Sequence, residues 1–216
     1  MKNTVLACFA HPDDAELWAG GTLLRCKENQ MDIVSICFET HDSLRTQECF
    51  KASKVINFDQ LIFLSRKTNW WNIENDDLTK LIQLITDVSP DLILSHPNDD
   101  LHPEHRLVSN LVVKAIIVAR DTIKKDIMLL ESSSYNGLTL NGVFQPTEII
   151  DITDYWDTKI KAVNEYQTQN PSELIRFIDS QSLFWGAIIN TKRAEGFRQY
   201  PVLGQYDRNT LLEKIR

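Results

Sequence analysis

Two patterns of apolar residues alternate along the first half of the chain. Continuous apolar runs of strand length span residues 4–10, Met31–Glu39, Leu61–Leu64 and Asp91–Ser95. Such runs are typical of parallel strands that are buried on both faces. The four runs therefore predict four strands of one parallel sheet.

Between these runs, apolar residues recur every three or four positions, which is the period of an amphipathic helix. The segments with this period are Asp14–Glu28, Ser43–Asn57, Asp76–Val88 and Glu104 to about Asp121. Strands that alternate with helices at this spacing indicate βαβ units. We therefore expect an α/β fold with a Rossmann-like, mostly parallel sheet and helices on both faces.

The second half of the chain is less regular. Strands are predicted at Ile127–Ser134 and Thr147–Ile152, and a helix at Asp154–Gln167. The C-terminal region shows a mixed pattern, and the apolar segments Leu174–Ile178 and Leu183–Ile189 are placed only loosely.

Length and composition are those of a globular protein with a sizeable core. The 216 residues are 43% hydrophobic and 25% charged, and no repeat, low-complexity segment or linker divides them. A chain of this length fits a single domain, which we expect over residues 1–216. The formal net charge of −7 argues against a surface that follows nucleic-acid phosphates, so we expect no nucleic-acid partner.

The sequence also predicts a cytoplasmic protein without a membrane span. The first strand follows Met1 within a few residues, which leaves no room for a signal peptide. The four cysteines show no CxxC spacing and are interpreted as reduced thiols. The best apolar run, Leu111–Ala119, is interrupted by Lys114 and is far shorter than the ~20 residues that a span needs.

Two clusters of polar residues follow predicted strands. Ala10–Asp14 (AHPDD) follows the first strand, and His96–His105 (HPNDDLHPEH) follows the fourth, and together they hold four of the five histidines. Loops at the strand ends of open α/β sheets converge on a ligand-binding crevice. We therefore expect the two clusters to meet at one metal site.

The residue types in these clusters suit a hydrolytic zinc site, which typically has three ligands drawn from His, Asp and Glu and one open position. His11 and Asp14 lie three positions apart across a strand-to-helix turn, so both could face the crevice. Asp13 could accept a proton from an activated water. The second cluster offers the further ligand, which would be His96, His102 or His105.

Each cluster alone also fits a structural interpretation. Pro12 restricts the backbone of a turn, and an aspartate is a favoured helix cap. Asn98–Asp100 would usually be a solvated loop. The presence of both clusters at strand ends favours the metal site.

At these residues the chain resembles the PIG-L/LmbE-like family of zinc-dependent N-acetyl sugar deacetylases. Residues 10–17 with Gly20–Leu23 resemble the opening motif of that family, and His96–His105 resembles its second motif. Arg45–Glu48 resembles its Arg-x-x-Glu element. Segments 144–153, 159–169 and 193–197 are similar to its weaker C-terminal motifs.

The resemblance implies a role for each matching residue. His11, Asp14 and His105 would bind zinc, although Fe²⁺ can occupy such sites as well. Asp13 would be the general base. His102 would stabilise the oxyanion as an imidazolium or protonate the leaving amine.

Two further residues match the motifs of the family. Asp100 would orient His102 and favour its charged form. Arg45 would contact oxygen atoms of the substrate. The alternative for Arg45 is a surface ion pair with Glu48 on the same helix.

The chain departs from the family pattern in three places. The usual Pro-Asp-His is Pro-Glu-His here, with Glu104 expected in the first turn of a helix. The loops at 39–43 and 65–71 lack the family's usual residues, and because such loops shape the substrate pocket, the resemblance implies the chemistry more directly than the substrate. Trp70 or Trp71 would either stack on a substrate or pack a loop onto the core.

The combined interpretation is a zinc-dependent amidohydrolase that removes an acetyl or other acyl group from an amino sugar or its conjugate. Alternatives are the same chemistry on a non-sugar amide, a non-haem iron redox enzyme and a catalytically silent metal-binding module. The expected partner is a small-molecule N-acylated amino sugar. The oligomeric state, including a homo-oligomer, and the roles of His41 and His96 stay open.

Overall fold

The computed structural model describes residues 2–38, 43–64, 75–203 and 211–215. Its sheet strands are β1 (Thr4–Phe9), β2 (Asp32–Cys37), β3 (Gln60–Phe63), β4 (Leu92–Ser95), β5 (Met128–Ser132), β8 (Glu148–Asp151) and β9 (Ala194–Gln199), and a small hairpin consists of β6 (Leu138–Thr139) and β7 (Gly142–Val143). The helices are α1 (Asp14–Glu28), α2 (Ser43–Ile56), α3 (Asn75–Val88), α4 (Pro103–Ile123), α5 (Trp156–Val163), α6 (Pro171–Ile188) and α7 (Leu211–Ile215). Short 3-10 turns lie at Tyr135–Gly137, Thr153–Tyr155 and Gln167–Gln169.

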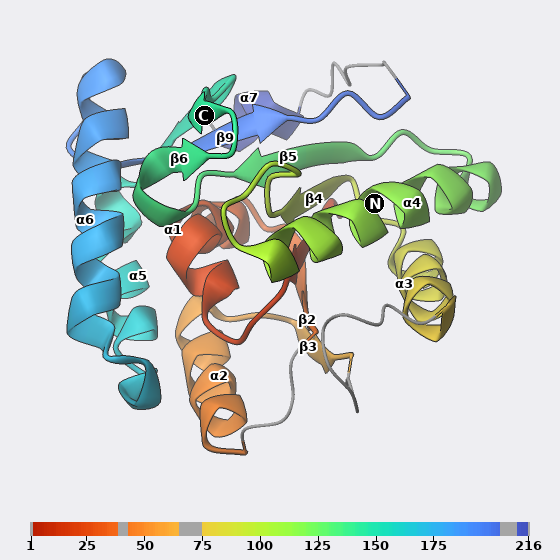
Figure 1. The fold of residues 1–216 in the computed structure, drawn as a ribbon, viewed down its shortest axis with the longest axis horizontal. Coiled ribbons are helices and arrows are strands. Elements are labelled where there is room, and N and C mark those ends of the chain that lie inside the picture. Colours follow the sequence, from red (N-terminus) through yellow and green to blue (C-terminus); the bar gives the residue numbers. More distant parts are fainter. Residues whose placement is uncertain (1, 39–42, 65–74, 204–210, 216) are drawn as a thin grey trace.

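The sheet has the strand order β3-β2-β1-β4-β5-β9-β8. The pairs among β1 to β5 are parallel, whereas β9 is antiparallel to both β5 and β8. The predicted mostly parallel α/β fold is therefore confirmed, with an antiparallel extension at one edge (Figure 1).

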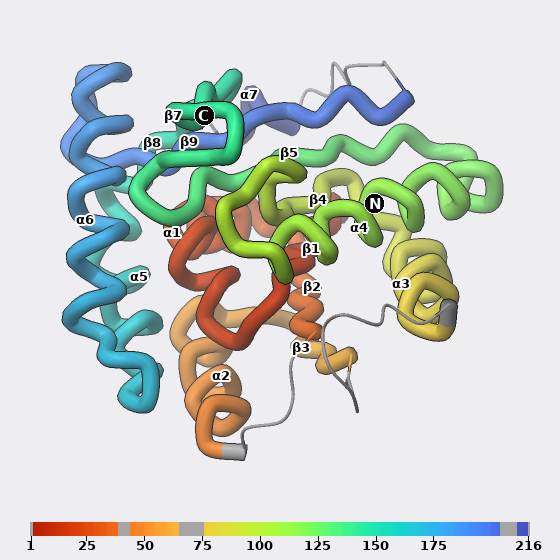
Figure 2. Tube along the Cα trace, in the orientation of Figure 1, coloured from red at the N-terminus to blue at the C-terminus, as the bar shows by residue number. Residues whose placement is uncertain are grey.

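Both faces of the sheet are covered, which explains the continuous apolar runs. Along β1, Val5 and Phe9 belong to one buried cluster, and Leu6 and Cys8 belong to the other. The first cluster packs against α1, α2, α5 and α7, and the second against α3 and α4. Figures 1 and 2 show α1, α2, α5 and α6 on one side and α3 and α4 on the other.

The C-terminal region differs most from the sequence-based prediction. The predicted helix Asp154–Gln167 ends at Val163, and the two loosely placed apolar segments belong to the single helix α6. The pattern of α6 is mixed because its outer face exposes apolar side chains, including Leu183 and Phe184. β9 was missed because Glu195 and Arg198 interrupt its apolar pattern, yet both are held by ion pairs inside the protein.

Gly21 allows a close approach between α1 and the end of β8. A Cβ atom at this position would lie 2.6 Å from the Cβ of Ile152, which is far inside van der Waals contact. The absence of a side chain at Gly21 therefore permits this close packing.

The strand order reverses between β1 and β4, and this reversal determines where the site lies. The two strands are neighbours, and Cys8 pairs with Ser95 in register. The crevice at such a switch point is the usual ligand site of open α/β sheets. Because His11 and His96 follow these strands directly, both clusters reach the same crevice.

Two findings bear on the environment of the chain. The four cysteines are buried and free of disulfides. None of the described helices is long and apolar enough to cross a membrane.

Candidate metal centre and active site

The structure brings His11, Asp14 and His105 together although the third is more than 90 positions away from the first. His11 Nδ1 lies 3.2 Å from Asp14 Oδ2, and His105 Nε2 lies 3.6 Å from Asp14 Oδ1. One donor atom from each residue lies within 4.8 Å of the others. Tetrahedral zinc with bonds of ~2.0–2.1 Å places its ligand atoms about 3.3 Å apart, so this spacing fits such an ion.

His105 supports the same interpretation through its two nitrogens. Its Nε2 is buried and has no hydrogen-bond partner among the described residues. Its Nδ1 lies 3.0 Å from Asp100 Oδ2. A carboxylate on one ring nitrogen leaves the lone pair of the other free for a metal, which is the usual arrangement of histidine ligands. The residues present therefore fit a divalent metal.

Asp100 differs from its expected role. Its Oδ2 binds the His105 ring and the Ser134 hydroxyl, which donates at 2.6 Å. Its Oδ1 accepts the backbone N–H of His102 at 2.7 Å. In the described structure Asp100 therefore orients the His105 ring and not the His102 ring, because the turn directs only the backbone of His102 toward the carboxylate.

Asp14 is the central acceptor of the site. Its Oδ2 accepts the backbone N–H of His11 at 2.7 Å, and its Oδ1 accepts the indole N–H of Trp18 at 2.9 Å. Burial alone would raise the pKa of Asp14, but the nearby rings of His105 and His96 hold it well below its usual range. Asp14 is therefore ionised, as a metal ligand must be.

His11 lies between two carboxylates. Its Nδ1 faces Asp14, and its Nε2 lies 2.6 Å from Glu104 Oε2. Burial acts to lower the pKa of His11, but the hydrogen bonds with Asp14 and Glu104 raise it to about 10. The His11 ring is therefore protonated at neutral pH when no metal is bound.

Asp13 precedes α1 with an unusual backbone conformation. Its φ of 112° lies in the left-handed region that non-glycine residues seldom adopt. Strained conformations of this kind are costly and cluster at active sites. Burial raises the pKa of Asp13 to about 7, with Arg45 opposing and Asp14 adding to the rise. A carboxylate with that pKa suits proton transfer near neutral pH.

Arg45 reaches the site from α2. It donates from Nη2 to Asp13 Oδ1 at 3.0 Å and from Nε to the carbonyl oxygen of Pro12 at 3.0 Å. Both carboxylate oxygens of Glu48 accept hydrogen bonds from Thr168. Arg45 thus contacts the predicted base, and a contact with substrate stays a prediction.

His102 caps the N-terminus of α4. Its Nδ1 accepts the backbone N–H of Glu104 at 3.3 Å, which leaves Nε2 as the protonated nitrogen of the neutral ring. Burial, together with the rings of His105 and His11, lowers the pKa of His102. The expected imidazolium is therefore disfavoured in this structure, and the ring presents a neutral N–H donor.

His96 orients its neighbours. Its Nε2 accepts the backbone N–H of Ala10 at 3.0 Å, and its ring stacks on His105 with centroids 3.6 Å apart. Burial and the neighbouring His105 lower the pKa of His96 to about 4, so it is neutral at pH 7. The sequence left the role of His96 open, and these contacts favour positioning of its neighbours.

The loop of the second cluster is held from β5 and β9. Glu131 accepts the backbone N–H of Asn98 at 2.8 Å, and Arg198 bridges Glu131 and Asp99, each at 2.7 Å. Arg198 also lies over the Phe144 ring. The C-terminal strand, which sequence patterns missed, therefore supports the loop that supplies Asp100 and the following residues.

An aromatic layer lies beside the three candidate ligands. The Tyr135 ring stacks parallel to His105 with centroids 5.8 Å apart, and it meets Trp18 edge-on at 5.2 Å. Sequence reasoning overlooked both residues. Trp18 had a signal, because it lies one helical turn beyond Asp14, but Tyr135 comes from the irregular turn after β5 and had none.

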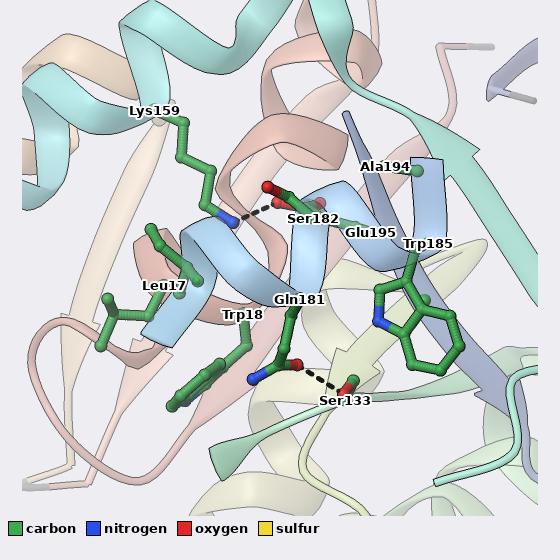
Figure 3. A pocket seen from close by; sticks show the side chains of 11 residues that line it. Leu17, Trp18, Ser133, Lys159, Gln181, Ser182, Trp185, Ala194 and Glu195 are labelled. Carbon is green, nitrogen blue, oxygen red and sulfur yellow. Dashed lines mark hydrogen bonds and ion pairs between the residues drawn. The ribbon is translucent and has the colours of Figure 1, made fainter. Parts of the chain in front are cut away.

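A small cavity lies behind Trp18 (Figure 3). Figure 3 shows its lining from α1, α6 and β9, with Gln181 bound to Ser133 and Lys159 bound to Glu195. Its volume of about 20 Å³ suffices for a single water and not for a sugar. We therefore do not regard it as the substrate site.

Some predicted positions lie outside the described residues. These are His41, Trp70 and Trp71, together with most of the two loops at 39–43 and 65–71 in which the sequence departs from the family pattern.

The chain is similar to curated proteins that are named as deacetylases. A probable N-acetyl-alpha-D-glucosaminyl L-malate deacetylase 2 of Bacillus cereus is 22% identical and aligns over 86% of this chain and 94% of that protein. The diacetylchitobiose deacetylase of Thermococcus kodakarensis is 21% identical over 91% of this chain and 83% of that protein.

A solved structure shows that the fold is also used elsewhere. GalB, the 4-carboxy-2-hydroxymuconate hydratase of Pseudomonas putida, matches with a TM-score of 0.78 at 20% identity and covers 97% of this chain and 99% of that one. The family model PIG-L, described as GlcNAc-PI de-N-acetylase, matches residues 6–116, which include both clusters and just over half of the chain. The chain therefore belongs to the PIG-L family.

Proposed function

We propose that this chain is a metal-dependent amidohydrolase that removes an acetyl or other acyl group from the nitrogen of an amino sugar or sugar conjugate. The observation on which this rests is the ligand set of His11, Asp14 and His105 with a buried carboxylate, Asp13, directly before Asp14 in the chain. Two relatives that this chain matches over 83% and 94% of their length bear the names of deacetylases of acetylated sugars or sugar conjugates, which supports the same substrate class here.

The donor set of two imidazoles and a carboxylate suits Zn²⁺, and Fe²⁺ can use the same donors. Such an ion would polarise the amide carbonyl and lower the pKa of an attacking water. The protein holds the ligands in place through Trp18 on Asp14 and Asp100 on His105.

Asp13 acts as the general base in this proposal. It takes a proton from the water as the water oxygen bonds to the carbonyl carbon. Arg45 holds the Asp13 carboxylate at Oδ1, which leaves Oδ2 for the water. Its positive charge also keeps Asp13 ionised over a wider pH range.

His102 stabilises the oxyanion of the tetrahedral intermediate through its neutral Nε2–H. A protein donor of this kind is typically worth ~3–4 kcal/mol in the transition state. The C–N bond then breaks as the nitrogen receives from Asp13 the proton that Asp13 took from the water. The products are a carboxylic acid and a free amine, so atoms and charge balance.

The buried, disulfide-free cysteines agree with a reducing compartment, and we expect the reaction to take place in the cytoplasm. The hydratase with the same fold shows that this architecture alone does not determine the reaction. Hydration of an unsaturated acid is therefore the second candidate, beside hydrolysis of a non-sugar amide.

The test is acetate release by zinc-loaded protein from a panel of free, nucleotide-linked and conjugated N-acetyl amino sugars, with Asp13→Asn measured in parallel. Turnover of one class that is lost in the variant, while zinc remains bound, supports the proposal. Zinc binding without acetate release from any member contradicts it and directs attention to hydration or non-sugar amides. Turnover that persists in Asp13→Asn means that the base is a different residue.

A further inference from the structure

Glu104 occupies the position at which the second motif of this chain departs from the usual Pro-Asp-His. It lies in the first turn of α4, and its Oε2 is 2.6 Å from His11 Nε2. The two side chains come from opposite clusters, 93 positions apart in the sequence. Their exposed fractions are 24% and 11%, so the contact is largely shielded from water.

The two nitrogens of His11 have different surroundings. Nδ1 faces the carboxylate of Asp14 at 3.2 Å, toward the proposed metal position, and Nε2 faces Glu104. A histidine that binds a metal through Nδ1 must carry its proton on Nε2. A carboxylate at Nε2 stabilises that tautomer and fixes the plane of the ring.

We propose that Glu104 is a positioning residue that selects the Nε2–H tautomer of His11 and orients its Nδ1 toward the metal. This inference rests on the metal site of the proposed function. Both histidine ligands then have a carboxylate partner. His105 has Asp100 at 3.0 Å in the interior, and His11 has Glu104 at 2.6 Å near the entrance.

The length of the side chain matters for this contact. An aspartate at position 104 would be shorter by one methylene, about 1.5 Å, so on the same backbone its carboxylate would lie farther from His11. The backbone N–H of Glu104 donates to His102 Nδ1 at 3.3 Å, which ties this part of α4 in place. The same residue therefore sets the tautomer of His102 through its backbone and that of His11 through its side chain.

A second interpretation uses the same atoms. Donors of His11, His102 and Glu104 lie within 4.8 Å of one another, so they could bind an additional ion instead of forming a hydrogen bond. The short contact of Glu104 with His11 favours the hydrogen bond. The two interpretations predict different metal stoichiometries, so one titration separates them.

The experiment compares Glu104→Gln, Glu104→Asp and Glu104→Ala with the wild type. Glu173→Gln is the control, because Glu173 is an exposed carboxylate in the first turn of another helix, α6. The zinc dissociation constant is measured by competition with a chromophoric chelator, and the protonated nitrogen of His11 by ¹⁵N NMR of the zinc-loaded proteins.

We expect one zinc per chain and a dissociation constant about 10- to 100-fold higher for Glu104→Ala and Glu104→Asp, which is the usual cost of losing such a partner. Glu104→Gln keeps a neutral acceptor and should fall between these and the wild type. The Nε2–H signal of His11 should be sharp in the wild type and in Glu173→Gln, and weakened or averaged in Glu104→Ala.

Equal dissociation constants and an unchanged His11 signal in all three variants would overturn the inference. Loss of a second zinc equivalent in Glu104→Ala would overturn it in favour of the additional ion. Neither measurement uses a substrate, so a failed acetate assay leaves this result intact. Conversely, the proposed hydrolysis stands if zinc binds equally well without Glu104.

Discussion

The indole N–H of Trp18 donates a hydrogen bond of 2.9 Å to Oδ1 of Asp14, one helical turn earlier in α1. This contact connects a carboxylate of the proposed metal site to a ring that is almost fully buried. It directs Oδ1 of the carboxylate toward Trp18 and His105, and leaves Oδ2 on the side of His11. The orientation of Asp14 is therefore set by the helix that follows it.

Replacement of Trp18 by phenylalanine removes this donor and keeps most of the ring. We expect Trp18→Phe to raise the zinc dissociation constant about tenfold or more, because outer partners of ligands typically contribute that much. Trp185→Phe is the control, since Trp185 lines the adjacent cavity without contacting a ligand. Equal zinc affinity of both variants and the wild type would show that the hydrogen bond does not hold Asp14.

Asp13→Asn should have opposite effects on activity, which we expect to be lost, and on the stability of the metal-free protein, which we expect to rise. The pKa of Asp13 is raised to about 7 from 3.8, so in metal-free protein its ionisation opposes folding increasingly as pH rises from 4 to 7. The variant should therefore gain stability over the wild type across that window, by at most about 4 kcal/mol, the equivalent of the difference between a pKa of about 7 and 3.8. Urea unfolding of the metal-free proteins at pH 4.5 and 7.5 measures this. A constant difference at both pH values would contradict the raised pKa.

Arg45→Met should move the acidic limb of the pH–rate profile. The guanidinium lowers the pKa of Asp13, so its removal raises that pKa and shifts the acidic limb of kcat/KM to higher pH. Activity at pH 6 should fall more than activity at pH 9. A uniform loss at all pH values would indicate instead that Arg45 contributes only substrate binding.

Metal uptake should release a proton from His11. The pKa of His11 is raised to about 10 by Asp14 and Glu104 in the metal-free protein, so zinc must displace a proton at neutral pH. We expect the zinc affinity to rise up to tenfold per pH unit between 6 and 8. Calorimetry in buffers of different ionisation enthalpy counts the protons, and a value near zero would contradict this assignment.

Removing one partner of the buried ion pair between Lys159 and Glu195 should destabilise the fold strongly. Both side chains are at most 5% exposed, and Glu195 also accepts the backbone N–H groups of Gly21 and Thr22. Lys159→Met or Glu195→Gln alone should lower the free energy of unfolding by about 3–5 kcal/mol, because each disrupts a buried charge pair.

The double variant tests the coupling. Lys159→Met combined with Glu195→Gln should cost less than the sum of the two single changes, since no unpaired charge remains. Chemical unfolding of the four proteins completes the cycle. Strictly additive costs would mean that the two side chains do not stabilise each other.

The sequence predicted the fold best in the segments that form the sheet buried on both faces and the helices that cover it. The strands β1 to β4 and the helices α1 to α4 could be predicted because their periodicity follows directly from the layers around the sheet. The meeting of the two polar clusters could be predicted for the same reason, since adjacent parallel strands bring their ends to one crevice. The choice of His105 among the histidines of the second cluster came from the family resemblance and not from the pattern.

Other features depend on contacts that no local pattern records. β9 was missed because the charged residues Glu195 and Arg198 interrupt its apolar pattern. Their ion-pair partners, Lys159 and Glu131, come from distant parts of the chain. The contact of the Asp100 carboxylate with the His105 ring could not be predicted because side-chain direction in a turn follows from the tertiary structure. The contact of Glu104 with His11 joins two clusters through a rotamer that the sequence does not specify.

Gly21 and Glu195 stand 174 positions apart in the chain, and that separation has a consequence for synthesis. A chain emerging from the ribosome exposes both histidine clusters long before β9 follows and inserts between β5 and β8. Contacts between such distant residues form late because closing the intervening loop costs entropy. Until then the backbone N–H groups of Gly21 and Thr22 in α1 lack their acceptor, Glu195. We therefore expect zinc to bind after the chain has folded and not to initiate folding.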